Sequence, residues 1–209
     1  MLIVTLPGMG QASWTDQPMS ELAKGFERVL DMLLPGRPIV LFGVSTGNLL
    51  TLGVTLPNIF HRVVLEPFFR TDTLWPFIKD ARRRLATHPE SLALREYLRV
   101  HFGITETDVE NRDYSALLQN ITQPTDVVVG EAPLLPERPL PTWPSFLEPD
   151  HRAMLAANPL VRIHQGPPGS GHSFGSTPED HRSFLIRLLH QRLREAWKRS
   201  PERADVPFE

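Results

Sequence analysis

The 209-residue chain contains no cysteine, which excludes disulfide bonds and thiolate chemistry and fits a reducing compartment. It also lacks a long apolar run, since no stretch approaches the roughly 20 apolar residues of a membrane-spanning helix. The apolar start at residues 1–7 has no basic residues before it and is interrupted by Pro7 and Gly8. It is therefore too short for the core of a signal peptide. We expect a cytoplasmic protein that does not interact with membranes.

The chain also lacks an excess of charge of either sign. The 22 Lys and Arg nearly balance the 24 Asp and Glu, and the net charge of −2 gives no reason to expect nucleic acid or an anionic membrane as a partner. Hydrophobic residues make up 41% and charged residues 22%, as in an ordinary globular domain. The length suffices for one well-packed core but not for two. We predict a single domain over residues 1–209.

Short apolar runs bounded by turn residues predict five buried parallel strands, at residues 2–6, 38–43, 61–66, 125–130 and 160–165. Helical patterns separate most of them, among them one that starts near Pro178 and continues to Trp197. This alternation predicts an α/β fold, with an open, mainly parallel sheet of about five strands and helices on both faces.

One connection is longer than a crossover needs. Residues 67–124 contain helical patterns around 74–86, 90–102 and 106–121. We predict a helical cap insertion over the carboxyl ends of the strands, where an active site would lie. Substrate would enter between it and the proline-rich segment 133–149. Aromatic residues of both segments suggest an apolar or aromatic acyl group, or else form the insertion's own core: Phe68, Phe69, Trp75, Phe77, Trp143 and Phe146.

Residues 43–47, Gly-Val-Ser-Thr-Gly, match the nucleophile-elbow pattern G-x-S-x-G. They follow an apolar strand and open a helical pattern, which is the context that the motif requires. We expect Ser45 to be held in a strained turn, with Gly43 and Gly47 present because side chains there would clash. The amide of Thr46, at a helix N-terminus, can stabilise an oxyanion. A chance match in a glycine-bearing turn is the alternative.

His172 follows the last predicted strand in Gly-Pro-Pro-Gly-Ser-Gly-His-Ser, residues 166–173. From that loop it can return to Ser45, in the chain order Ser–acid–His. The segment also approaches the phosphate-binding loop G-x-x-x-x-G-K-[ST], but it lacks the lysine, and no later strand supplies a magnesium-binding aspartate. We predict no cofactor and no metal site, because the other seven histidines show no metal-ligand spacing: His61, His88, His101, His151, His164, His181 and His190.

These segments resemble the α/β-hydrolase superfamily over most of the chain: the elbow at 43–47, the Val-Val-Val-Gly of 127–130, and the Gly-Ser-Gly-His of 169–172. The resemblance implies a Ser–His–acid triad. In that family the acid usually lies a few residues past the glycine that ends the penultimate strand. By this resemblance Pro133 occupies that position here, and Glu131 comes too early.

A minority of the family carries the acid one strand earlier, followed by proline. Leu65-Glu66-Pro67 fits this pattern. We therefore prefer Glu66 as the acid, with Glu131 as the second candidate. Either carboxylate can instead cap a neighbouring helix.

The chain departs from the family at its front end, where members normally have more strands. Residues 5–10, Thr-Leu-Pro-Gly-Met-Gly, are similar to a family segment that lies one strand and helix before the elbow, and in that register the oxyanion loop is missing. A direct right-handed crossover instead places the first strand beside the elbow strand. We favour this placement, in which Met9 and Gly10 offer backbone amides near Ser45. In both cases the shortened sheet edge invites a partner chain or a homodimer.

We predict a serine hydrolase that cleaves an ester or thioester in a small-molecule acyl substrate. Ser45 attacks the acyl carbon, His172 acts first as base and then as acid, and Thr46 stabilises the oxyanion. The alternative is a catalytically degenerate α/β-hydrolase-like protein that serves as a binding or assembly partner. The missing strands and the displaced acid favour that alternative.

Overall fold

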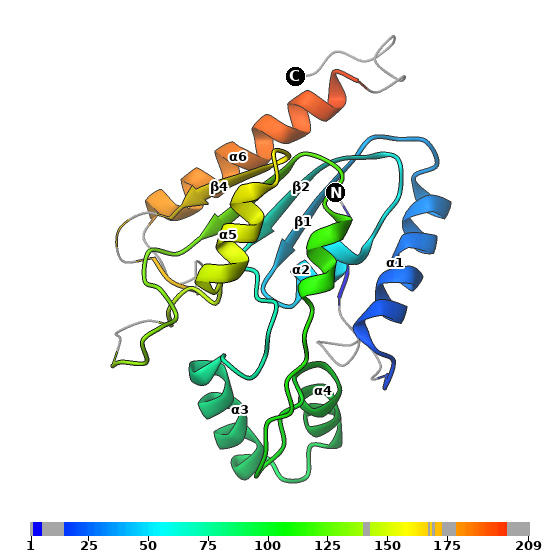
Figure 1. The fold of residues 1–209 in the computed structure, drawn as a ribbon. Coiled ribbons are helices and arrows are strands. Elements are labelled where there is room, and N and C mark those ends of the chain that lie inside the picture. Colours follow the sequence, from blue (N-terminus) through cyan, green and yellow to red (C-terminus); the bar gives the residue numbers. More distant parts are fainter. Residues whose placement is uncertain are drawn as a thin grey trace.

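The protein is described by a computed structural model that covers residues 2–5, 15–139, 143–166, 168, 170–172 and 179–199. Within these residues four parallel strands form one sheet in the order β1-β2-β3-β4, with helices on both faces (Figure 1). The α/β architecture is as predicted. The strands are β1 (Ile39–Val44), β2 (Ile59–Leu65), β3 (Thr125–Val129) and β4 (Val161–Gln165).

These strands match four of the five predicted runs. For the fifth, at residues 2–6, the structure shows no strand at residues 2–5, which are exposed, and residue 6 lies outside the described residues. The sheet is therefore one strand smaller than expected in the described part of the chain.

Four helices flank the sheet: α1 (Met19–Leu33) before β1, α2 (Gly47–Gly53) between β1 and β2, α5 (Pro149–Ala157) between β3 and β4, and α6 (Glu179–Trp197) after β4. The sequence had indicated α1, α2 and α6, but not α5. No helix in the described part of the chain is both long enough and apolar enough to span a bilayer.

Successive residues of the central strands face opposite helical layers, because side chains alternate along a strand. Val63 and Leu65 of β2 pack with Leu188 of α6, whereas Val64 between them packs with Leu52 of α2. All three β2 residues are at most 3% exposed. Burial on both faces explains why these strands have continuous apolar runs rather than alternating ones.

The long connection between β2 and β3 leaves these layers. Two of the helices predicted in residues 67–124 are present, as α3 (Trp75–Thr87) and α4 (Leu92–Phe102), and Figure 1 shows them as a pair beyond one end of the sheet. The third, predicted over 106–121, is wrong for most of its length, because only the 3-10 helix η1 (Ser115–Asn120) is helical there.

The aromatic residues of this connection mostly form its core. The Phe102 ring of α4 lies 5.5 Å from that of Phe68 and 4.5 Å from that of Phe77, between ring centroids. The same cluster extends to Leu49 and Leu50 of α2. The helices α3 and α4 therefore share one apolar cluster with α1 and α2, and none of the described strand residues belongs to it.

Candidate active site

The turn after β1 holds Ser45 in the left-handed region, with φ of 51°, a strained backbone conformation for a residue other than glycine. Gly43 allows α2 to approach the strand this closely, because a Cβ there would lie 2.4 Å from Oγ1 of Thr51. The expectation for Gly47 was wrong, since a Cβ at that position would meet no atom within 4 Å. Only the first glycine of the motif is sterically required.

The elbow is attached to the neighbouring strand through the carbonyl of Leu65. This oxygen accepts hydrogen bonds from the backbone N of Ser45 at 3.0 Å and from Nδ2 of the fully buried Asn48 at 2.7 Å. Thr46 occupies the N-cap of α2, and its Oγ1 accepts from the Tyr97 hydroxyl of α4 at 3.4 Å. Burial raises the pKa of Tyr97, so its hydroxyl remains a donor to Thr46, the residue that follows Ser45.

His172 reaches the serine from the loop after β4. Its Nε2 lies 2.9 Å from Oγ of Ser45, and the ring of Phe146 stacks on the imidazole with centroids 3.7 Å apart. The loop passes so close to Gly130 that a Cβ there would lie 2.7 Å from Cα of Gly171. Because Gly130 has no side chain, the loop that carries His172 can pack directly against the end of β3.

Glu66 lies on the opposite side of the imidazole. Its carboxylate is fully buried, and Oε2 is 3.4 Å from Nδ1 of His172. The backbone amide of Gly130 donates to Oε1, and that of Phe146 donates to Oε2 at 3.1 Å. Glu66 also has φ of 51°. Nδ1 makes no hydrogen bond to the described residues, so its contact with Glu66 is an ion-pair contact longer than the roughly 2.7–2.9 Å of a charge-assisted hydrogen bond.

The structure thus brings together Ser45, His172 and Glu66. The other candidate acid, Glu131, has an exposed side chain, and its backbone N donates to the carbonyl of Ser170 at 2.9 Å. Met9 and Gly10, the predicted source of a second oxyanion donor, lie outside the described residues.

A family model described as the alpha/beta hydrolase family matches residues 1–204. The chain belongs to this family. MenH from S. aureus has a similar structure, with a TM-score of 0.61 and 16% identity over 92% of this chain and 82% of that one. A thermophilic esterase has a similar structure with a TM-score of 0.56, at 18% identity over 91% of this chain and 79% of that one. For an enol-lactonase from Burkholderia xenovorans the TM-score is 0.54, at 15% identity over 89% of this chain and 77% of that one. At these identities the likeness shows the fold alone, and no curated protein matches significantly.

One residue of this α/β-hydrolase site was not given its role by sequence reasoning. Phe146 was expected to contact substrate or to lie in the core of the insertion, yet its backbone N donates to Glu66 and its ring stacks on His172. The backbone carbonyl of the nearby Trp143 accepts a hydrogen bond from the backbone N of His172 at 2.9 Å. No local sequence signal indicates these contacts, because their partners are distant in the chain.

A second polar cluster lies at the amino ends of the strands and was also missed. Asp126 of β3 is bound by Nε2 of His61 at 2.7 Å, Nε2 of His164 at 2.8 Å and Nε of Arg192 at 2.6 Å. Burial acts to raise the pKa of Asp126, but the hydrogen bonds from these side chains outweigh it and hold the pKa well below its usual 3.8. A pocket of about 730 Å³ opens beside this cluster. The detectable signal was a charged residue inside an otherwise apolar strand.

Proposed function

We propose that this α/β-hydrolase is a serine hydrolase that cleaves an ester or thioester through an acyl-enzyme. The observation that carries the proposal is the 2.9 Å separation between Nε2 of His172 and Oγ of Ser45 on a strained elbow. A serine hydroxyl is a weak nucleophile until a base within hydrogen-bonding reach removes its proton. The fold shared with proteins named as an esterase and an enol-lactonase is compatible with acyl chemistry.

In this mechanism Oγ of Ser45 attacks the acyl carbon while Nε2 of His172 takes its proton. The resulting imidazolium then protonates the departing alcohol or thiol, and a water molecule releases the acyl group by the same route. The buried charge of Glu66 stabilises the imidazolium through Nδ1. The amide of Thr46 at the start of α2 stabilises the tetrahedral oxyanion.

The acyl group would lie between the α3–α4 pair, acting as a cap, and the segment around Trp143. Phe68 and Phe69 are both 1% exposed and belong to the core. The partly buried Trp143, whose ring centroid is 6.3 Å from that of His172, remains as a wall for substrate. An aromatic wall beside the reacting atoms favours an apolar acyl group.

The test compares Ser45→Ala with the wild type, using a short p-nitrophenyl ester and a fluorophosphonate label. We expect the variant to lose both turnover and labelling while its melting temperature changes little. Ser20→Ala, at an exposed serine of α1, is the matched control and should behave as the wild type. Equal turnover by Ser45→Ala would place the reaction elsewhere. A wild type that neither turns over nor labels would favour the binding or assembly alternative.

A further inference from the structure

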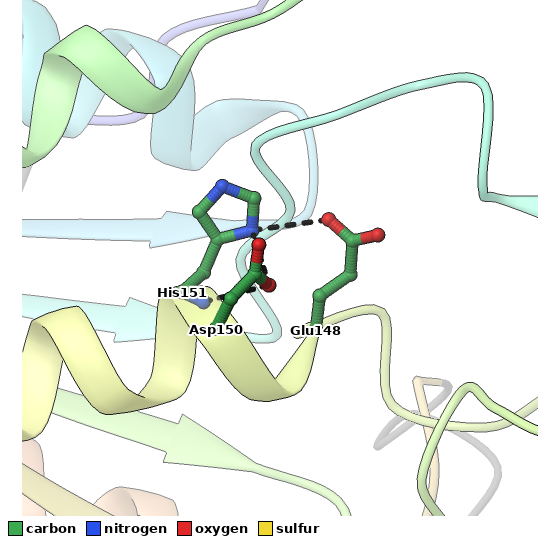
Figure 2. A group of neighbouring side chains, drawn as sticks. All are labelled: Glu148, Asp150 and His151. Atoms are coloured by element: carbon green, nitrogen blue, oxygen red, sulfur yellow. Dashed lines mark hydrogen bonds and ion pairs between the residues drawn. The ribbon is translucent and has the colours of Figure 1, made fainter.

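Three ligand-type side chains lie together at the start of α5, outside the proposed hydrolase site (Figure 2). Nδ1 of His151 is 3.1 Å from Oε2 of Glu148 and 3.6 Å from Oδ1 of Asp150. The three ligand atoms all lie within 4.8 Å of one another. The sequence separates these residues by at most three positions, so one turn of helix presents them to a single point.

Two of these side chains are buried without a hydrogen-bond partner at the atoms that face each other. Glu148 is 6% exposed and His151 is 3% exposed. Neither Oε2 of Glu148 nor Nδ1 of His151 makes a hydrogen bond to the described residues. Unpaired buried polar atoms cost free energy. A positive species between the imidazole nitrogen and the carboxylates would remove that cost.

The other imidazole nitrogen is already engaged. Nε2 of His151 lies 2.7 Å from Oγ of Ser115 in η1, and the ring packs on Phe69 with centroids 5.1 Å apart. When Nε2–H donates to this hydroxyl, Nδ1 directs its lone pair toward Glu148 and Asp150. A histidine fixed in this way by a hydrogen bond on its far nitrogen is the usual arrangement for a metal ligand.

The two carboxylates already act on a neighbouring cation, Arg70. The hydrogen bond to Asp72 is the main cause that raises the pKa of Arg70, and the negative charge of Glu148 is the next, with a smaller contribution from Asp150. The N-terminus of α5 accounts for acidic residues at this position. It does not account for a buried imidazole nitrogen that makes no hydrogen bond to the described residues and lies 3.1 Å from Oε2 of Glu148.

We propose that Glu148, Asp150 and His151 bind a divalent cation of the Zn²⁺ class. Four-coordinate zinc with bonds of about 2.0–2.1 Å separates its ligand atoms by about 3.3 Å, and the observed 3.1 and 3.6 Å lie on either side of that spacing. The side chain of Asp150 is 65% exposed, so it can rotate inward, and water fills the fourth position. An imidazole with two carboxylates falls short of the six to eight oxygens that calcium requires.

This site differs from the sequence-based expectation of no metal. Its position suggests a consequence for the hydrolase site, because Phe146, which contacts both Glu66 and His172, lies two residues before Glu148. A cation at the start of α5 would restrain that segment. Cation binding itself does not depend on the proposed hydrolysis and is measured without it.

The experiment titrates the full chain with Zn²⁺ in competition with a chromophoric chelator. We expect one site that His151→Asn and Asp150→Asn each weaken more than 100-fold. Ser115→Ala, which removes the supporting hydroxyl, should weaken it by about 10- to 100-fold. The matched control is His88→Asn with Glu90→Gln, an exposed pair 3.6 Å apart, which should bind as the wild type. Zn²⁺ should also raise the melting temperature of the wild type but not of Asp150→Asn.

Asp150 is exposed, so Asp150→Asn separates loss of binding from loss of fold, and melting without metal verifies that the variant is folded. Absence of zinc binding by the wild type would overturn the proposal. Unchanged binding in Asp150→Asn and His151→Asn would overturn it as well. Either result would leave Glu148 and His151 as an ion pair that caps α5.

Discussion

Asp126 and Glu66 are buried carboxylates beside imidazoles at opposite ends of the same sheet. Both oxygens of Asp126 are occupied by side-chain donors, from His61, His164 and Arg192. Glu66 instead has two backbone amides and an imidazole nitrogen at 3.4 Å that makes no hydrogen bond to the described residues. A fully satisfied network fixes a structure. In the second arrangement no hydrogen bond to a described residue fixes Nδ1 of the imidazole whose Nε2 lies 2.9 Å from the serine hydroxyl.

The largest effect should come from Glu66→Gln, which keeps the shape of the side chain but removes its charge. We expect kcat for the p-nitrophenyl ester to fall by about 10⁴-fold, as when a triad aspartate is amidated in a serine protease, because the imidazolium loses its counter-ion. Steady-state kinetics with Glu131→Gln as the control measure this directly, and the control should keep its activity. A large loss in Glu131→Gln and not in Glu66→Gln would assign the acid to Glu131, in the loop after β3. Only small losses of kcat in both variants would mean that no triad functions.

At the amino end the corresponding change, Asp126→Asn, should act on stability instead. Removing one partner of a buried ion pair lowers the free energy of unfolding by up to about 3–5 kcal/mol. Here His61, His164 and Arg192 lose the carboxylate that they bind, while Arg192 keeps its ion pair with Glu195. Urea unfolding measures the loss, and kcat per folded molecule should stay at the wild-type level. The exposed pair of Lys79 and Glu137 provides the control, since Glu137→Gln should change stability little. A fall in kcat at unchanged stability would give the amino end a functional role.

Lowering the pH should narrow the difference in stability between the wild type and Asp126→Asn, which is a smaller effect. The pKa of Asp126 is lowered by folding, so its contribution to stability is fully present above the unfolded value of 3.8 and is lost as the pH falls toward the folded pKa. Between about pH 5 and pH 3 the wild type should therefore lose part of its stability advantage over Asp126→Asn. Urea unfolding of both proteins across this range is the measurement. A constant difference would contradict the lowered pKa.

The smallest effect concerns motion, since the proposed cap covers only the carboxyl end. Amides of α3 and α4 should exchange faster than those of β1 and β3, because caps must open and are drawn from the less stable part of a fold. Their exchange should slow when a fluorophosphonate occupies Ser45. Hydrogen exchange followed by mass spectrometry reports both. Protection equal to that of the strands, unchanged by the inhibitor, would make the insertion structural.

The proposed catalytic residues were accessible from the sequence because their signals are local. Ser45 lies in a five-residue motif between a strand and a helix, His172 lies in the loop after the last strand, and Glu66 is a strand-ending acid before proline. The contacts of Asp126 could not be predicted from the sequence, because they depend on strand register, which places Val63 opposite Asp126. Register is set by packing and not by the residues of one strand alone.

Two errors in the helices have similar causes. The helical spacing over 106–121 was overridden by an isolated bridge between Ile104 and Val109 and by another between Arg70 and Asp113, since tertiary pairing outweighs weak propensity. The helix α5 was missed because the proline-rich segment before it dominated the interpretation, although Pro149 in its first turn is a helix-start signal.

The position of Glu66 at the end of β2 has a consequence for how such an enzyme could be re-engineered. In the proposed mechanism the segment that follows β3 supplies no reacting side chain and contacts Glu66 and His172 through backbone groups and one aromatic ring. With Glu66 proposed as the acid, residues 132–139 are not required to provide one. Leu134 is 1% exposed and its carbonyl accepts a hydrogen bond from Nε1 of Trp75, so it must stay. We expect residues 135–139 to tolerate exchange as a cassette, so that substrate preference can be redesigned there while the proposed reacting groups stay untouched.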